Sequence, residues 1–190
     1  MKKLNRFIII VAKIAEVFMW VGAAMSLIIT VLSAIGKMDL IRFFTDSTPG
    51  TALLTNGSFT LHALDASGNV VNGAFLLFFL TLALVLALMA MCARNVHLIF
   101  KTSAGETAFS RGATPFQPDN IRMVREIGIF MIAIPVVQLV MSIIAQIALG
   151  ADMVESSLNM FNVFIGLVVL ALSQYFAYGM KLENDVDGLV

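Results

Sequence analysis

Four long apolar segments without a charged residue constrain this chain more than any other feature. They cover residues 17–36, 74–93, 127–151 and 156–180. A helix that crosses a bilayer needs about 20 consecutive apolar residues. The composition agrees, because 59% of the residues are hydrophobic and only 13% are charged, whereas soluble domains carry about 25% charged residues. The sequence therefore predicts an integral membrane protein.

The fold class that follows is all-α integral membrane, a four-transmembrane-helix bundle with a small extracytoplasmic β-hairpin loop. We expect one membrane domain over residues 1–190. Its predicted parts are spans at about 8–36, 74–100, 121–149 and 157–181, an outer loop at 37–73 and an inner loop at 101–120. A cleaved signal peptide is the alternative for the first span, but such a peptide has an apolar region of about 7–15 residues. We therefore interpret the first span as an uncleaved anchor.

The distribution of lysine and arginine predicts the orientation of these spans. The N-terminal segment, the loop between the second and third spans and the C-terminal tail together carry ten basic residues. The first and third loops carry two, Lys37 and Arg42. Because the richer side of a membrane protein faces the cytoplasm, we expect a multi-pass protein of the bacterial inner membrane with both termini in the cytoplasm.

Local signals predict some order in the two larger loops. Residues 53–64 alternate weakly, and Asn56-Gly57 is typical of a hairpin turn, so we expect a β-hairpin that caps the outer face. A second turn is expected at 65–69. On the inner side, Pro118 suits the first position of a helix and Asp119 suits the positive end of its dipole.

Polar residues recur within the apolar segments and are candidates for a function. Gln138, Ser142 and Gln146 follow one another at intervals of four residues, and Asn159 and Asn162 share a face of the last span. Amides and small residues in spans usually bond and pack neighbouring helices. We therefore interpret these side chains as packing contacts in the bundle interior, and a polar path between spans three and four is the alternative.

The sequence contains no recognisable set of catalytic or metal-binding residues. Cys92 is the only cysteine, and His62 and His97 fall on opposite sides of the predicted membrane. No motif pairs a nucleophile with a base, and the net charge of zero excludes nucleic-acid binding by bulk charge. We expect a protein that is not an enzyme and has no cofactor, with the lipid bilayer as its main partner.

Two stretches together resemble a known family. The first contains Thr114-Pro115-Phe116, Asn120, Arg122, Arg125, Ile127 and Gly128, and the second contains residues 175–179, Leu182 and the acidic residues that follow. With four spans in about 190 residues, the chain is similar to the bacterial membrane family DUF2975, a domain of unknown function. The tail departs from the family pattern, because it ends in residues 187–190 without the usual acidic and β-branched ending.

The resemblance implies a partner rather than an activity. Members of the family are often encoded beside a small helix-turn-helix DNA-binding protein, which implies a sensory or regulatory role at the membrane. The leading hypothesis is therefore a non-enzymatic membrane protein that acts with a small soluble DNA-binding regulator. The alternative is a small transporter or channel subunit, active as a homo-oligomer.

Charged residues of both signs meet on the predicted cytoplasmic side. They form a candidate docking surface composed of Arg111, Arg122, Arg125, Glu183, Asp185 and Asp187. Such a surface binds a soluble partner or closes on itself. We expect self-closure, with Arg122 or Arg125 near the acidic tail, and the two interpretations are compatible.

Overall fold

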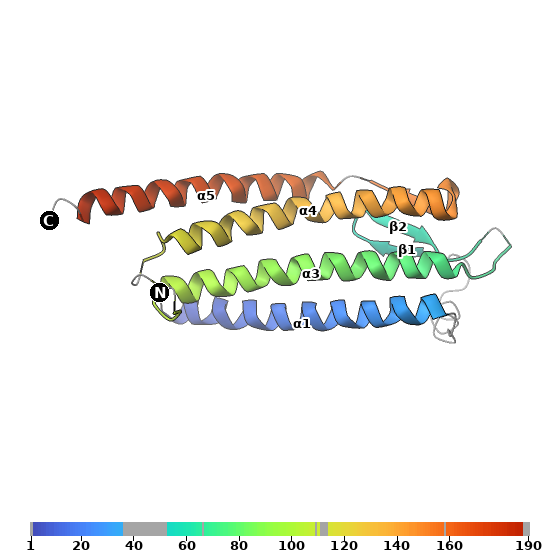
Figure 1. The fold of residues 1–190 in the computed structure, drawn as a ribbon, viewed down its shortest axis with the longest axis horizontal. Coiled ribbons are helices and arrows are strands. Elements are labelled where there is room, and N and C mark those ends of the chain that lie inside the picture. Colours follow the sequence, from blue (N-terminus) through green and yellow to red (C-terminus); the bar gives the residue numbers. More distant parts are fainter. Residues whose placement is uncertain are drawn as a thin grey trace. The chain divides into compact units, whose positions relative to one another are not determined.

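The computed structural model describes residues 2–35, 53–65, 67–108, 110, 114–157 and 159–187. Its long helices are α1 (Lys2–Ile35), α3 (Asn72–Ser103), α4 (Pro118–Leu149) and α5 (Met160–Asp187) (Figure 1). Its short elements are β1 (Leu53–Asn56), β2 (Phe59–His62), the 3₁₀ helix η1 (Ala151–Met153) and β3 (Val154–Ser156). The mostly helical fold with a small antiparallel sheet agrees with the sequence.

The four long helices are each long and apolar enough to cross a membrane. They also extend beyond the predicted spans: α3 and α4 have 32 residues each, which corresponds to about 48 Å at 1.5 Å per residue. The prediction for the start of α4 is confirmed, because the helix begins at Pro118 with Asp119 in its first turn. Each charge-free apolar segment thus covers only part of its helix.

The chain divides into two compact units; α1, α3 and α4 contribute to both, whereas α5 belongs to unit 1 except for its first residue, Met160. Unit 1 consists of Met1–Met19, Leu88–Ala133 and Phe161–Val190, and unit 2 of Trp20–Ala87 and Ile134–Met160. On α4 the division falls beside Pro135. Proline has no N–H with which to bond the carbonyl of residue 131 in a regular helix.

The sheet belongs to unit 2 and has the order β1-β2-β3, with antiparallel pairing throughout. The predicted hairpin is present, but its two-residue turn is Gly57-Ser58, since Asn56 pairs with Phe59. Gly57 has a φ of +62°, which suits the first turn position of a type II′ hairpin. The strand β3 was not predicted, and it pairs with β2 from Phe59 to Leu61.

The hairpin packs into the core of unit 2 and does not merely cap it. Phe59 and Leu61 are 0% exposed, and they belong to one apolar cluster with Phe75 and Phe78 of α3 and Met141 of α4. The alternation of β2 explains this burial, because successive side chains of a strand point to opposite faces. The side chains that alternate with them on the other face, Thr60 and His62, are half-buried.

Unit 1 contains a close crossing of α4 and α5 at two glycines. A Cβ atom added to Gly166 would lie 2.8 Å from the carbonyl oxygen of Gly128, and one added to Gly128 would lie 2.9 Å from that of Gly166. Small residues allow helix backbones to approach in this way. The backbones meet so closely that a larger side chain at either position requires the helices to move apart.

Candidate functional site

Gln138 braces the tip of the hairpin in unit 2. Its side-chain Nε2 donates to the carbonyl oxygen of Asn56 at 2.9 Å, and its Oε1 accepts from Ser58 Oγ at 3.0 Å. The residue is 5% exposed. It lies eleven residues before the end of α4 at Leu149. The hairpin tip therefore contacts α4 at a point about 16 Å from the C-terminal end of that helix. Both ends of the Gln138 amide are therefore occupied by the hairpin.

The other polar residues of the spans do not share this environment. Ser142 is buried, with an Oγ that has no hydrogen-bond partner among the described residues. Gln146 is exposed, and Asn159 and Asn162 are half-buried. Gln138, Ser142, Gln146 and Asn159 belong to unit 2, whereas Asn162 belongs to unit 1. Of the predicted stripe, Gln138 and Ser142 are therefore buried within this chain, whereas Gln146 is exposed.

Two buried amides organise the loop between α3 and α4 in unit 1. Gln117 Nε2 donates to the carbonyl oxygens of Thr114 and Thr102, at 2.7 and 3.3 Å. Asn120 Nδ2 donates to Pro115 O at 2.9 Å and to Ser103 Oγ at 3.0 Å. These bonds hold the end of α3 against the segment that begins α4. Both amides are almost completely buried, so the loop has a fixed conformation at this point.

The two stretches that carry the family resemblance contact each other. The ring of Phe116 packs against Phe176, with centroids 5.8 Å apart, and a Cβ atom on Gly179 would lie 2.6 Å from the Phe116 ring. Thr114 Oγ1 donates to Glu183 Oε2 at 3.0 Å. The inner loop thus closes onto the end of α5, and Gly179 provides the space for the ring.

A groove lies along this contact, and we call it the tail groove. It has a volume of about 530 Å³ and is lined by Thr114, Phe116, Gly179, Leu182, Glu183 and Val186. Leu182 and Val186 are exposed, as are the neighbouring residues Asn184 and Asp185. The groove therefore combines an apolar floor with an acidic rim formed by Glu183, and Asp185 is a second exposed acid two residues further along α5.

The inner loop contacts α5 through Thr114 and Phe116, which are not the arginines that the sequence placed near the acidic tail. Arg122 Nε lies 3.4 Å from Glu126 Oε1, one turn along its own helix. Arg125 is exposed, and within the described part of the chain no ion pair joins either arginine to Glu183 or Asp185. The reason is local, because residues four apart on a helix are neighbours. Arg111 and the side chain of Asp187 lie outside the described residues.

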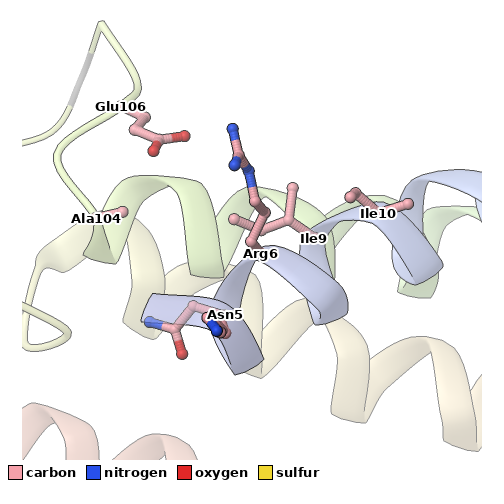
Figure 2. A pocket seen from close by; sticks show the side chains of 7 residues that line it. Asn5, Arg6, Ile9, Ile10, Ala104 and Glu106 are labelled. Atoms are coloured by element: carbon pink, nitrogen blue, oxygen red, sulfur yellow. The ribbon is translucent and has the colours of Figure 1, made fainter. Parts of the chain in front are cut away.

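A second cavity, which we call the N-terminal pocket, lies between the start of α1 and the end of α3. It has a volume of about 720 Å³ and is lined by Lys3, Asn5, Arg6, Ile9, Ile10 and Glu106, together with Ala104. Figure 2 shows Arg6 and Glu106 pointing into the same open space from different elements. The pocket therefore joins two cations, one carboxylate and an apolar wall.

A helix C-cap fixes the position of Glu106. The N–H of Glu106 donates to Lys101 O at 3.0 Å and that of Gly105 donates to Thr102 O at 3.1 Å, while Gly105 has a φ of +78°. This is the pattern of a Schellman motif, in which a left-handed glycine ends the helix. Glu106 is therefore held by the backbone at the C-terminal end of α3.

Two polar contacts of unit 1 were not predicted from the sequence. His97 Nδ1 lies 3.0 Å from the carbonyl oxygen of Ile9, and because a carbonyl only accepts, Nδ1 carries the proton. Asn95 Nδ2 donates to Glu126 Oε2 at 2.9 Å. A polar residue at a helical interval within an apolar face is the available signal, but it does not reveal the partner. These contacts tie α3 to α1 and to α4.

Charged groups elsewhere do not assemble into a metal site in the described part of the chain. Lys13 Nζ lies 3.0 Å from Glu16 Oε2 on α1, and His62 Nε2 lies 3.4 Å from Glu155 Oε1 across the sheet. Each of these acids has one close basic neighbour. Two pockets of unit 1 combine charge with open volume.

No family model matches this chain, and no curated protein or solved structure matches it. The geometry and charge of the two pockets are therefore the basis for a function.

Proposed function

We propose that this chain is a multi-pass membrane protein of the bacterial inner membrane that docks a small soluble DNA-binding regulator at its tail groove. The observation that carries the proposal is the combination of an apolar floor and an acidic rim in the tail groove, next to the close contact of Phe116 with Gly179. The role is regulatory and does not involve catalysis.

Exposed apolar side chains support insertion into a membrane. On α4 they run from Ile129 to Ile147, and on α5 from Met160 to Val186. Soluble monomers rarely expose contiguous apolar patches of more than a few hundred Å². The distribution of lysine and arginine favours a cytoplasmic location for the loop between α3 and α4 and for the end of α5. A four-helix bundle with both termini inside is the arrangement that we propose.

The chemistry of the tail groove favours a basic partner. A DNA-binding domain carries clustered lysine and arginine that face the phosphates of its site. Glu183 offers a carboxylate to the same side chains within the groove, and Leu182 and Val186 offer apolar surface beside it. Asp185, two residues further along α5, is a second exposed carboxylate. Binding at the groove would therefore compete with binding of the regulator to DNA, which gives a mechanism for retention at the membrane.

The test uses the full-length chain, purified in mild detergent from cells that also express a tagged small helix-turn-helix protein encoded beside it. We expect recovery of the two proteins in comparable amounts. The double variant Glu183→Gln/Asp185→Asn should weaken the complex roughly tenfold, because each exposed ion pair contributes about 0.2–1 kcal/mol. An excess of duplex DNA should release the regulator.

Glu155→Gln is the matched control, because Glu155 is an exposed acid on β3, far along the chain from the tail groove. It should leave the complex intact. Retention of the regulator by the double variant, or an equal loss in the control, would contradict the proposal. A chain that purifies only as a homo-oligomer with a bound small molecule would favour the transporter alternative.

The transporter alternative has little support from the arrangement of the polar residues. Both ends of the Gln138 amide bond the hairpin, and Gln146 is exposed. A path would require these side chains to line one wetted cavity.

A further inference from the structure

We propose that the N-terminal pocket binds the headgroup of an aminophospholipid, with the lipid phosphate at Arg6 and Lys3 and the primary ammonium at Glu106. The inference rests on the membrane location in the proposed function, but it concerns a different pocket and needs no regulator. The pocket would recognise a ligand whose headgroup carries a negative phosphate and a positive ammonium at a fixed separation, and which is attached to acyl chains.

The cationic side of the pocket comes from one face of α1. Lys3 and Arg6 are three residues apart, so they lie on neighbouring positions of the helix surface. Both are exposed, and Asn5 beside them is half-buried. Lys3 also stands in the first turn of α1, where the helix dipole adds a partial positive charge. A phosphate placed here meets two cations and the favourable end of a dipole.

The anionic side of the pocket comes from α3. Glu106 lies three residues after the last residue of this helix, Ser103, and is held there by the Gly105 cap. The C-terminal end of a helix carries a partial negative charge, so a carboxylate at this position lacks the favourable dipole that a cation would receive. Among the described residues no ion pair joins Glu106 to Arg6 or Lys3, although all three line the pocket. An ammonium group would be stabilised by both the carboxylate and the dipole.

The two sides are neighbours because the start of α1 lies beside the end of α3. The bond from His97 Nδ1 to Ile9 O, at 3.0 Å, joins the two helices near the pocket. The positive end of the α1 dipole therefore lies beside the negative end of the α3 dipole. This pair of charges is complementary to a zwitterionic headgroup. An anionic lipid would gain from Arg6 and Lys3 but would be repelled by Glu106.

The apolar wall accounts for the acyl chain. Ile9 and Ile10 line the pocket. Ile10, Phe7 and Val11 are exposed apolar side chains of α1, and Phe7 and Val11 also line a smaller neighbouring cavity. A headgroup held at Arg6 can direct its chains along this surface. A soluble compound with the same headgroup would bury much less apolar area.

The test titrates the purified full-length chain in detergent with dioleoylphosphatidylethanolamine or dioleoylphosphatidylglycerol and counts bound lipids by native mass spectrometry. We expect the ethanolamine lipid to bind roughly threefold more tightly, in line with one exposed ion pair. Arg6→Gln should weaken both lipids roughly fivefold. Glu106→Gln should remove or reverse the preference, because the two cations then act without the carboxylate.

Lys181→Gln is the control, because it removes one exposed cation from α5 and should behave like the unmodified chain. Equal binding of the two lipids by the unmodified chain, or an unchanged preference in Glu106→Gln, would overturn the proposal. Equally tight binding of glycerophosphoethanolamine, which lacks acyl chains, would overturn the lipid and assign a soluble ligand. Loss of the regulator complex with lipid preference intact would reject only the proposed function.

Discussion

The two units of this chain use their polar residues in different ways. In unit 2 the Gln138 amide is occupied by the hairpin turn, and Phe59 and Leu61 fill the space between strand and helices. In unit 1 buried amides fix the loop, but charged side chains line two open pockets. Unit 2 is therefore built for stability, and unit 1 offers its charges to other molecules. The predictions below test this difference.

The largest effect is expected from Phe59→Ala in unit 2. The change removes a ring that is 0% exposed from the apolar cluster, and such truncations lower the free energy of unfolding by about 3–5 kcal/mol. Unfolding of the purified chain in detergent by heat or denaturant measures the loss. Leu53→Ala on the neighbouring strand is the control, because Leu53 is 48% exposed. An equally large loss in the control would show that the hairpin does not depend on its buried face.

A smaller loss is expected from Gly166→Val in unit 1. The added side chain would meet the backbone oxygen of Gly128, which no rotamer change can relieve, so we expect a loss of about 1–3 kcal/mol. Ala171→Val adds a β-branched side chain to an exposed position of the same helix and should be nearly neutral. The same unfolding measurement compares the two. Equal stability of both variants would mean that α4 and α5 do not cross closely.

Gln138→Leu separates the packing interpretation from the polar path. It leaves Asn56 O and Ser58 Oγ without their bonds to the amide, and we expect a loss of about 1–3 kcal/mol in the free energy of unfolding. Gln146→Leu, two turns further along α4, changes an exposed residue and should leave stability within about 0.5 kcal/mol. Similar losses from both variants would argue that the two amides act together.

The smallest effect concerns the turn between β2 and α3. The Asn69 backbone N–H, together with that of Ser67, holds the pKa of Asp65 below its ordinary value of 3.8. A carboxylate with a lowered pKa stabilises the fold above its ordinary pKa, and this contribution is lost as the pH falls through the folded-state value. Asp65→Asn should therefore be less stable than the unmodified chain at pH 6, with a difference that narrows below about pH 4.

The measurement for Asp65 is thermal unfolding of both proteins across this pH range. A constant difference between them at all pH values would contradict the role of the ionised carboxylate.

The sequence predicted the long helices and the hairpin because both depend on local patterns. Apolar length defines the spans, and Pro118 with Asp119 defines the start of α4. The hairpin turn was placed one residue early, since Gly57 serves as the first turn residue rather than the second. The strand β3 was missed because three residues carry no alternation, and its pairing partner lies about ninety residues earlier in the chain.

The contacts that define the candidate site were not visible in the sequence. The acid Glu183 was expected to lie near an arginine, and it accepts a hydrogen bond from Thr114. Arg122 pairs with Glu126, one turn away on its own helix. The bond between Gln138 and Ser58 spans 80 residues. The N-terminal pocket depends on a helix cap at Gly105 and on the approach of α1 to α3. Such long-range contacts depend on the packing of the helices and not on a local sequence pattern.

The central claim is that the tail groove faces the cytoplasm, where a soluble regulator can reach it. The most direct measurement is cysteine accessibility in a Cys92→Ser background, with a single cysteine introduced as Lys181→Cys on α5 or as Glu155→Cys on β3. A membrane-impermeant maleimide should label Glu155→Cys in intact spheroplasts and Lys181→Cys only after the membrane is permeabilised. Labelling of Lys181→Cys in intact spheroplasts would contradict the account.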